Sequence, residues 1–148
     1  MQEMVEGRAA RALERLLQIV WFGSMWTVGY LVAPVLFSVI PDRVLAGLVA
    51  GHLFRAVAWI GLLGGGVLTL IECLRWRAGG GRWRALLLLS MLVLVAVGEF
   101  WLQPAMEALK AAGVSSGGEF ARLHGIAASI YLLQSLLALG VVLGARRS

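Results

Sequence analysis

The chain has 148 residues, of which 60% are hydrophobic and 14% are charged, and its mean hydropathy is +0.87. A soluble domain of this size cannot bury so much apolar surface in one core, so these values exclude a water-soluble protein. The formal net charge of +5 does not indicate a nucleic-acid partner, because the basic residues lie at the ends of apolar runs rather than on one polar face. We therefore expect an integral membrane protein that binds no nucleic acid.

Four apolar stretches are each long enough to span a hydrocarbon core roughly 30 Å thick. They predict an all-α bundle of four transmembrane helices in one integral membrane domain, residues 1–148. The predicted crossings are about 16–40, 53–74, 84–103 and 123–145.

The first crossing follows a short mixed-charge segment, Glu3–Arg15, whose acidic and basic residues alternate. We expect this segment to form an amphipathic helix that lies at the membrane interface. Pro34, together with Gly23 and Gly29, should make the first crossing easy to bend.

The second helix is predicted to begin near Arg43, after the Pro41–Asp42 turn, and to continue to about Leu74. At 1.5 Å per residue this is about 48 Å, which exceeds what the bilayer needs. Its apolar part leaves His52 and Arg55 near one membrane boundary.

Glu72 lies near the other boundary, one helical turn from Arg75. A glycine turn flanked by four arginines and two tryptophans follows at 75–84 and is typical of a cytoplasmic loop. Pro104 is expected to end or kink the third crossing at Gln103. Ser116 and Glu119 have capping-box spacing for the last helix.

The lysine and arginine residues near the crossings predict the orientation. Three groups fall on one side of a four-helix bundle: Arg8, Arg11 and Arg15; Arg75, Arg77, Arg82 and Arg84; and Arg146 with Arg147. The positive-inside rule then places both termini in the cytoplasm. The expected location is the plasma (inner) membrane, with the lipid bilayer as the surrounding partner.

Most polar residues of the crossings share one depth near the outer boundary, and the inner half is expected to be nearly bare. The residues at this depth are His52, Arg55, Glu99, Gln103, Arg122 and His124. An ionisable group there costs several kcal/mol unless it is paired, hydrated or able to snorkel. Helical spacing predicts that His124 faces the bundle centre with Tyr131 and Ser135 below it, while Arg122 points to the headgroups or to Glu119.

These residues indicate a small polar cavity in which Arg55 countercharges Glu99 and the two histidines supply titratable nitrogens. The predicted ligand-binding residues are Arg55, Glu99, Gln103, His124 and Tyr131. The cavity would bind a small ligand, an ion or a partner protein, and a role auxiliary to transport is compatible with such a site. The simpler interpretation is that these side chains only snorkel to the interface.

We expect no enzymatic activity and no catalytic residue, because the chain has no phosphate loop, no His-Glu-x-x-His and no Gly-x-Ser-x-Gly. Four lone serines are instead expected to bond to helix backbone: Ser24, Ser38, Ser90 and Ser129. Three glycine pairs with Gly-x-x-x-Gly spacing fit tight packing within the bundle or a homo-oligomer: Gly47 with Gly51, Gly61 with Gly65, and Gly140 with Gly144.

The leading expectation is that the protein binds no cofactor. Two alternative interpretations each require one. A redox protein could hold haem iron between His52 and His124. A divalent metal could use His52, Glu99 and His124. A third alternative is a structural assembly factor that packs through its glycine faces.

The chain resembles the transmembrane protein 205-like family of small four-helix membrane proteins, whose bacterial members are a domain of unknown function. The resemblance rests on four motifs in order: Gly29-x-x-x-x-Pro34-x-x-Phe37, Ala46-Gly47 followed by Leu53-Phe54, Trp101-Leu-Gln-Pro104, and Phe120-x-x-x-His124-Gly125. It covers about residues 16–143 and implies that Gln103, Pro104 and His124 belong to the family pattern, from which His52 departs. It implies no catalytic residue and no substrate.

Overall fold

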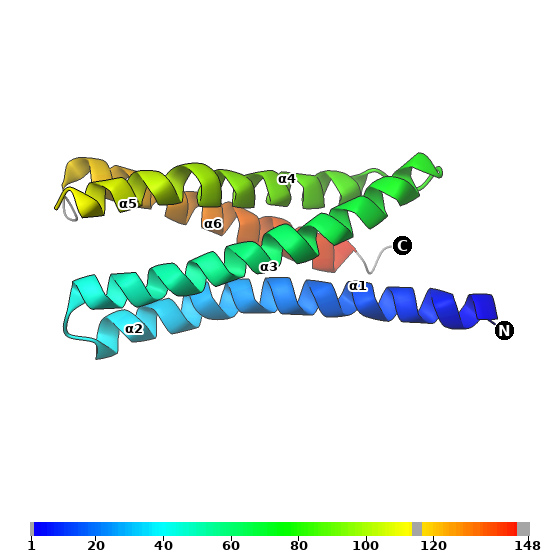
Figure 1. The fold of residues 1–148 in the computed structure, drawn as a ribbon. Coiled ribbons are helices and arrows are strands. Elements are labelled where there is room, and N and C mark those ends of the chain that lie inside the picture. The colour runs from blue at the N-terminus through cyan, green and yellow to red at the C-terminus, as the bar shows by residue number, and fades with distance from the viewer. Residues whose placement is uncertain (1, 114–116, 145–148) are drawn as a thin grey trace.

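The computed structural model describes residues 2–113 and 117–144, and helices form nearly all of this part of the chain (Figure 1). The helical elements are α1 (Gln2–Thr27), η1 (Val28–Val32), α2 (Ala33–Val39), α3 (Arg43–Arg77), α4 (Trp83–Val97), η2 (Gly98–Leu102), α5 (Gln103–Ala111) and α6 (Gly118–Gly144). They join into four long helices, each long and apolar enough to cross a membrane. The predicted all-α membrane fold is confirmed.

The four long helices form an up-down bundle. Helix α3 packs against α1 on one side and against α4 on the other, while α6 packs against α4 and meets α1 along a looser seam. We call the end that holds the start of α1, the α3–α4 turn and the end of α6 the terminus end. The opposite end, with the α2–α3 turn and the start of α6, is the loop end (Figure 1).

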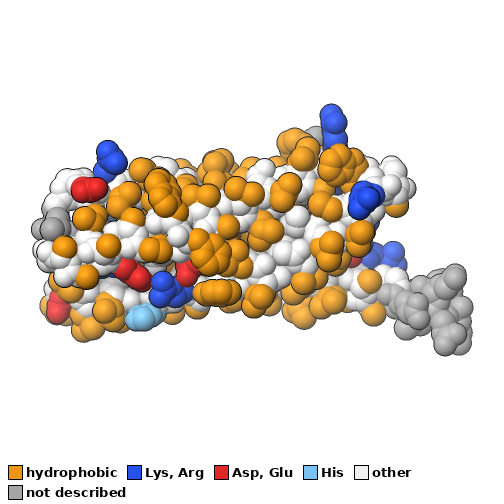
Figure 2. Space-filling view, turned by 45° about the horizontal axis from the view of Figure 1, so that its top comes forward, with side chains coloured by type: hydrophobic (Ala, Val, Ile, Leu, Met, Phe, Trp, Pro, Cys, Tyr) orange, Lys and Arg blue, Asp and Glu red, His pale blue; other side chains and the backbone are white. Residues whose placement is uncertain are grey.

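Large apolar side chains fill the inside of the bundle and also cover its outside. Trp21, Met25 and Met91 are at most 1% exposed, whereas Ile19 and Leu63 are each 68% exposed. In Figure 2 hydrophobic side chains cover the middle of the visible face, and charged side chains gather toward both ends. An apolar exterior of this extent is stable against lipid chains and would associate in water.

Helix α3 begins where the sequence predicts and ends at Arg77, three residues beyond the expected Leu74. Asp42 caps it by accepting hydrogen bonds from the backbone N–H groups of Val44 (2.9 Å) and Leu45 (3.2 Å). At the other end Gly79 has φ +94°, a left-handed conformation that glycine adopts without strain. The predicted start of the second helix near Arg43 is confirmed.

Neither Pro34 nor Pro104 ends its helix, and the regular α-helical hydrogen bonding changes before each of them. A π-helical turn precedes each proline by two residues, η1 before Pro34 and η2 before Pro104, and the helix then continues. Proline removes one backbone donor and crowds the carbonyl four residues earlier, and in both helices that carbonyl lies within the π turn. Of the two outcomes expected at Gln103, an end or a kink, the end is not found, because the helix continues as α5 to Ala111.

The Glu3–Arg15 segment is helical, as expected, and it is continuous with the first crossing. Helix α1 runs unbroken from Gln2, so this segment prolongs the first crossing. The sequence places no helix-breaking residue at the junction, and Glu14 is held by α3, as described below. Ser116 of the predicted capping box and residue 145 of the last crossing lie outside the described residues.

Only one of the three glycine pairs is covered closely. The indole of Trp21 lies on Gly61 and Gly65, so a Cβ added there would fall 2.5 Å and 2.6 Å from ring atoms. At Gly140 and Gly144 an added Cβ would meet ordinary contacts of 3.7 Å and 3.9 Å. Tight packing within the bundle is therefore confirmed for the Gly61 pair, which α1 occupies.

Candidate functional site

An ion-paired group of three side chains lies in the loop-end half of the bundle, and we call it the loop-end cluster. Arg55 of α3 donates a hydrogen bond from Nε to Glu99 Oε1 at 3.0 Å. Its Nη2 lies 3.2 Å from Glu107 Oε1 of α5. The predicted pairing of Arg55 with Glu99 is confirmed, whereas Glu107 was not predicted as a partner.

Burial differs sharply among the three groups. The Glu99 side chain is 6% exposed, that of Arg55 is 40% exposed and that of Glu107 is 51% exposed. Arg55 therefore connects an internal carboxylate with one at the surface. Because charge at membrane depth is costly, pairing with Arg55 offsets the cost of burying the Glu99 carboxylate.

The local backbone explains why Glu99 points inward. Glu99 lies in η2, and both Glu99 and Leu102 of that π turn are buried. A π turn holds more residues than an α turn, so it changes which residues face α3. Such turns occur frequently at functional sites, and this one carries the most buried carboxylate of the loop-end half.

The cluster has more negative than positive charge. With both carboxylates ionised, the single guanidinium of Arg55 leaves one negative charge uncompensated. Arg55 can balance either carboxylate but not both. This arrangement can accept a cation beside Glu99 while Arg55 remains with Glu107.

The predicted inward position of His124 is wrong. His124 is exposed and stacks on Phe120 of its own helix, with ring centroids 6.2 Å apart and planes 13° apart. Leu123 occupies the inward position instead and packs with Leu102 and Met106. The start of α6 packs beside α5 rather than over the bundle centre, so the inward direction there is turned by about one residue, or roughly 100°.

Further along α6 the prediction is better. Tyr131 and Ser135 do face the other helices: Tyr131 donates a hydrogen bond to the Met25 carbonyl, and Tyr30 donates one to Ser135 Oγ at 2.9 Å. Phe54 of α3 meets the Tyr131 ring edge-on at 5.2 Å. Tyr131 thus ties α6 to two other helices in the bundle interior.

The other predicted polar residues of this half lie nearer the surface. Gln103 is half-buried, and Arg122 and His52 are exposed. Exposure of Arg122 agrees with its predicted direction toward the headgroups. The exposure of His52 matches interfacial placement more closely than a position inside a cavity.

The proposed metal triad is wrong. Among the described residues no three His, Cys, Asp or Glu side chains come together in a way that could hold a metal ion, and this search included His52, Glu99 and His124. The two histidines lie on α3 and α6, which are diagonal in the bundle, and both rings are exposed. We find no feature of the described chain that favours haem ligation by this pair.

The terminus-end half is not bare, contrary to expectation. Arg75 of α3 donates hydrogen bonds to both carboxylate oxygens of Glu14 on α1 and to Glu72 Oε1 at 3.1 Å. Arg84 Nε of α4 lies 3.2 Å from the same Glu72 oxygen, at an angle that forms no hydrogen bond. We call these four residues the terminus-end cluster.

Both carboxylates of the terminus-end cluster are nearly buried, with side-chain exposures of 11% for Glu14 and 8% for Glu72. The predicted proximity of Glu72 to Arg75 is confirmed. No pattern in the sequence indicates that Glu14, 61 positions from Arg75, would join them. The cluster connects three of the four long helices by charge.

All four lone serines bond to backbone, as predicted. Each hydroxyl donates to a carbonyl three or four residues earlier: Ser24 to Trp21, Ser38 to Val35, Ser90 to Leu86 and Ser129 to Gly125. A further polar residue that sequence reasoning overlooked is Gln134, which is 6% exposed in the middle of α6. Its spacing of three and four residues from the inward-facing Tyr131 and Ala138 could have identified it.

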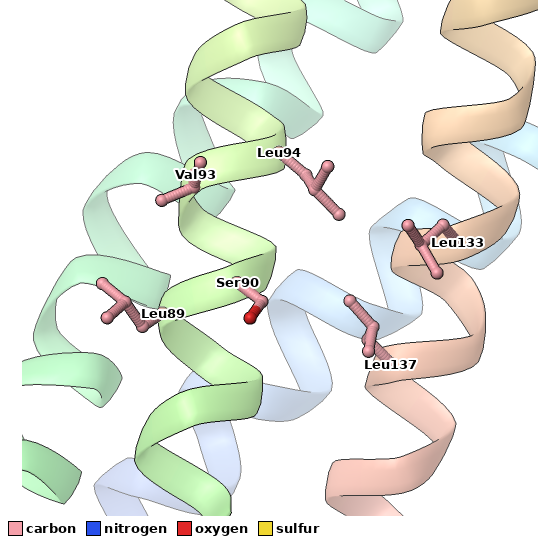
Figure 3. A pocket seen from close by; sticks show the side chains of 6 residues that line it. All are labelled: Leu89, Ser90, Val93, Leu94, Leu133 and Leu137. Carbon is pink, nitrogen blue, oxygen red and sulfur yellow. The ribbon is translucent and has the colours of Figure 1, made fainter.

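Two grooves lie outside the ion-paired clusters. One runs between α4 and α6, where Leu94 approaches Leu133 and Leu137 across the gap (Figure 3). It is almost wholly apolar, and the Ser90 hydroxyl in it already donates to Leu86. The other lies at the α1–α6 seam and carries Arg15 and Gln18.

One comparison with known proteins found a match. The sequence model of a family described as a domain of unknown function, DUF4149, matches residues 16–115. No curated protein and no solved structure matches the chain. The matched range contains Arg55, Glu99 and Glu107, that is, the whole loop-end cluster.

Proposed function

The chain belongs to the DUF4149 family of domains of unknown function, and we propose that it is a non-enzymatic membrane protein whose loop-end cluster binds a small cation. The observation that carries this proposal is Glu99, a carboxylate about nine-tenths buried whose one guanidinium partner is shared with a second carboxylate. An intramembrane ionisable residue is a functional-site candidate by default. The ligand is an inorganic ion or a small organic cation, and a role auxiliary to transport is consistent with four crossings.

The proposed mechanism is an exchange of partners around Glu99. Arg55 is half-exposed and already reaches Glu107, so it can remain there while an incoming cation takes its place beside Glu99. The internal carboxylate then keeps a countercharge throughout. Low local dielectric makes this electrostatic contact stronger than the same contact in water.

The test is thermal unfolding of the detergent-purified full chain with Na⁺, K⁺, Mg²⁺, methylammonium, guanidinium and spermidine. We expect at least one of them to raise the Tm of the wild type, since a ligand at 100 times its Kd stabilises by about 2.7 kcal/mol. Glu99→Gln retains an oxygen that accepts from Arg55 but removes the charge, so the shift should be lost.

The matched control is Glu119→Gln, which removes an exposed carboxylate from the first turn of α6 at the same end. This variant should respond as the wild type does. Equal shifts in wild type and Glu99→Gln for every cation would show that the cluster is only a structural ion pair.

We also propose that the terminus end faces the cytoplasm and that the membrane is the plasma (inner) membrane. Charge supports this orientation: among the described residues the terminus end carries seven arginines and four glutamates, Arg8, Arg11, Arg15, Arg75, Arg77, Arg82 and Arg84 with Glu3, Glu6, Glu14 and Glu72. The loop end carries four of each sign, Arg43, Arg55, Lys110 and Arg122 with Asp42, Glu99, Glu107 and Glu119. Excess arginine beside short turns favours the cytoplasmic side.

Single-cysteine labelling checks the orientation, because Cys73 is the one cysteine of the chain. In a Cys73→Ser background, Ala112→Cys at the loop end should react with a membrane-impermeant maleimide in intact cells. Gly81→Cys in the α3–α4 turn should react only after permeabilisation. The reverse pattern would invert the proposed topology.

Within this family assignment, we propose that the chain is similar to the transmembrane protein 205-like proteins. The motifs that support this assignment include Gly29, Pro34 and Pro104, which in the structure mark the two π turns. The homo-oligomer also remains a proposal. It would use Gly47 with Gly51 or Gly140 with Gly144, since Trp21 covers the Gly61 pair.

A further inference from the structure

The groove at the α1–α6 seam has the construction of a site for one phospholipid molecule. Its lining on α1 is a single helical stripe with spacings of three and four residues, and α6 contributes one residue: Arg15, Gln18, Ile19, Phe22, Gly23, Trp26 and Val142. The polar members, Arg15 and Gln18, lie at the terminus end of the stripe, and the rest are apolar apart from the bare backbone of Gly23.

The groove exists because α1 and α6 are in close contact only in the loop-end half of the bundle. Toward the loop end, Tyr131 lies directly on Gly29, where an added Cβ would overlap its ring. Six residues earlier, a Cβ added at Gly23 would meet nothing within 4 Å. The hollow has a volume of about 380 Å³, which falls within the range of roughly 300–1,000 Å³ for small-molecule sites.

The length of the groove fits one membrane leaflet. From Arg15 to Trp26 is eleven residues, or about 16 Å along the helix. That is about half of a hydrocarbon core roughly 30 Å thick. A lipid with its headgroup at Arg15 would therefore place an acyl chain along the stripe and end near the midplane.

The charge of this end favours an anionic headgroup. No described carboxylate pairs with Arg15, because Glu14 and Glu72 are both engaged by Arg75. Arg8 and Arg11 lie on the preceding turns of α1 and are also exposed. The α4–α6 groove has no such charge, and so it offers no contact to a headgroup.

We propose that the α1–α6 groove binds an anionic diacyl phospholipid of the leaflet at the terminus end, with Arg15 and Gln18 on the phosphate and Phe22, Gly23 and Trp26 along one acyl chain. This site is independent of the loop-end cluster, which lies in the opposite half of the bundle.

The experiment is native mass spectrometry of the full chain in detergent with equimolar phosphatidylglycerol and phosphatidylcholine. One arginine near the surface favours an anionic lipid by roughly fivefold, so the wild type should retain phosphatidylglycerol over phosphatidylcholine by about that factor. Arg15→Gln should remove the preference. Arg43→Gln, which removes an exposed arginine at the loop end, should keep it.

A second pair of variants tests the acyl part of the site. Gly23→Leu should fill the hollow and reduce retention of both lipids, whereas Gly66→Leu adds the same side chain where a Cβ also meets nothing within 4 Å, away from the groove. Equal retention of the two lipids by the wild type, or equal behaviour of Arg15→Gln and Arg43→Gln, would overturn the proposal. Neither result would bear on cation binding by Glu99.

Discussion

Arg75→Gln should destabilise the bundle by about 3 kcal/mol. Removing one partner of a buried ion pair costs about 3–5 kcal/mol, and we expect the lower part of that range because the Arg75 side chain is 45% exposed. Glu14 would be left without a cation, while Glu72 would keep Arg84 nearby. Thermal or SDS-induced unfolding of the purified protein measures the loss.

The control for this variant is Arg77→Gln, two residues along the same helix. Arg77 is exposed and belongs to none of the ion pairs of the described residues, so its loss should change stability by no more than about 0.5 kcal/mol. Adding Glu14→Gln to Arg75→Gln should restore part of the stability, because the buried carboxylate of Glu14 is then no longer left without a cation, while Glu72 keeps Arg84 nearby. If Arg75→Gln and Arg77→Gln unfolded alike, the terminus-end cluster would contribute no stability.

Gly65→Ala should weaken the contact between α1 and α3 by about 1–3 kcal/mol, the usual cost of overpacking. The new Cβ would lie 2.6 Å from the Trp21 ring, which is 1% exposed and has no room to move aside. Gly61→Ala should act in the same way, and the two together should cost more than either alone. The measurement is again the unfolding midpoint of the purified protein.

Gly66→Ala is the matched control, because an added Cβ at this neighbouring position meets nothing within 4 Å. Alanine is the better helix former, so this variant should be neutral or more stable by up to about 1 kcal/mol. Combining Gly65→Ala with Trp21→Leu should cost less than the sum of the two single changes, since the smaller side chain leaves space. Strict additivity would mean that Trp21 does not cause the cost.

The fold was predictable from the sequence because hydropathy and turn chemistry determine it locally. Four apolar runs specify four helices, Asp42 specifies where α3 begins, and Gly79 specifies where it ends. The two π turns were not predictable in this way. Proline only indicates that the regular hydrogen bonding must change, and whether a helix ends or widens depends on packing against its neighbours.

The only part of the site that was predictable is the ion pair, because a carboxylate inside the membrane needs a countercharge at its own depth. Glu99 needs a cation at its depth, and Arg55 was the nearest candidate, so this pair was found. His124 was misplaced because a fixed 100° per residue assumes that α6 packs against one neighbour throughout its length. Glu14 was missed because its partner comes from another helix, and no periodicity of α1 encodes that distance.

The two π turns and the tightest contacts of the bundle lie in different halves of the molecule. The turn η1 lies between α1 and α2 and η2 lies between α4 and α5, in the two long helices that stand diagonally across the bundle, and both occur in the half that carries Arg55 and Glu99. In the terminus-end half, Arg75 binds Glu14, and the indole of Trp21 packs closely on Gly61 and Gly65. Rearrangement around a bound cation can therefore be confined to the loop-end half, while the terminus-end half keeps its shape.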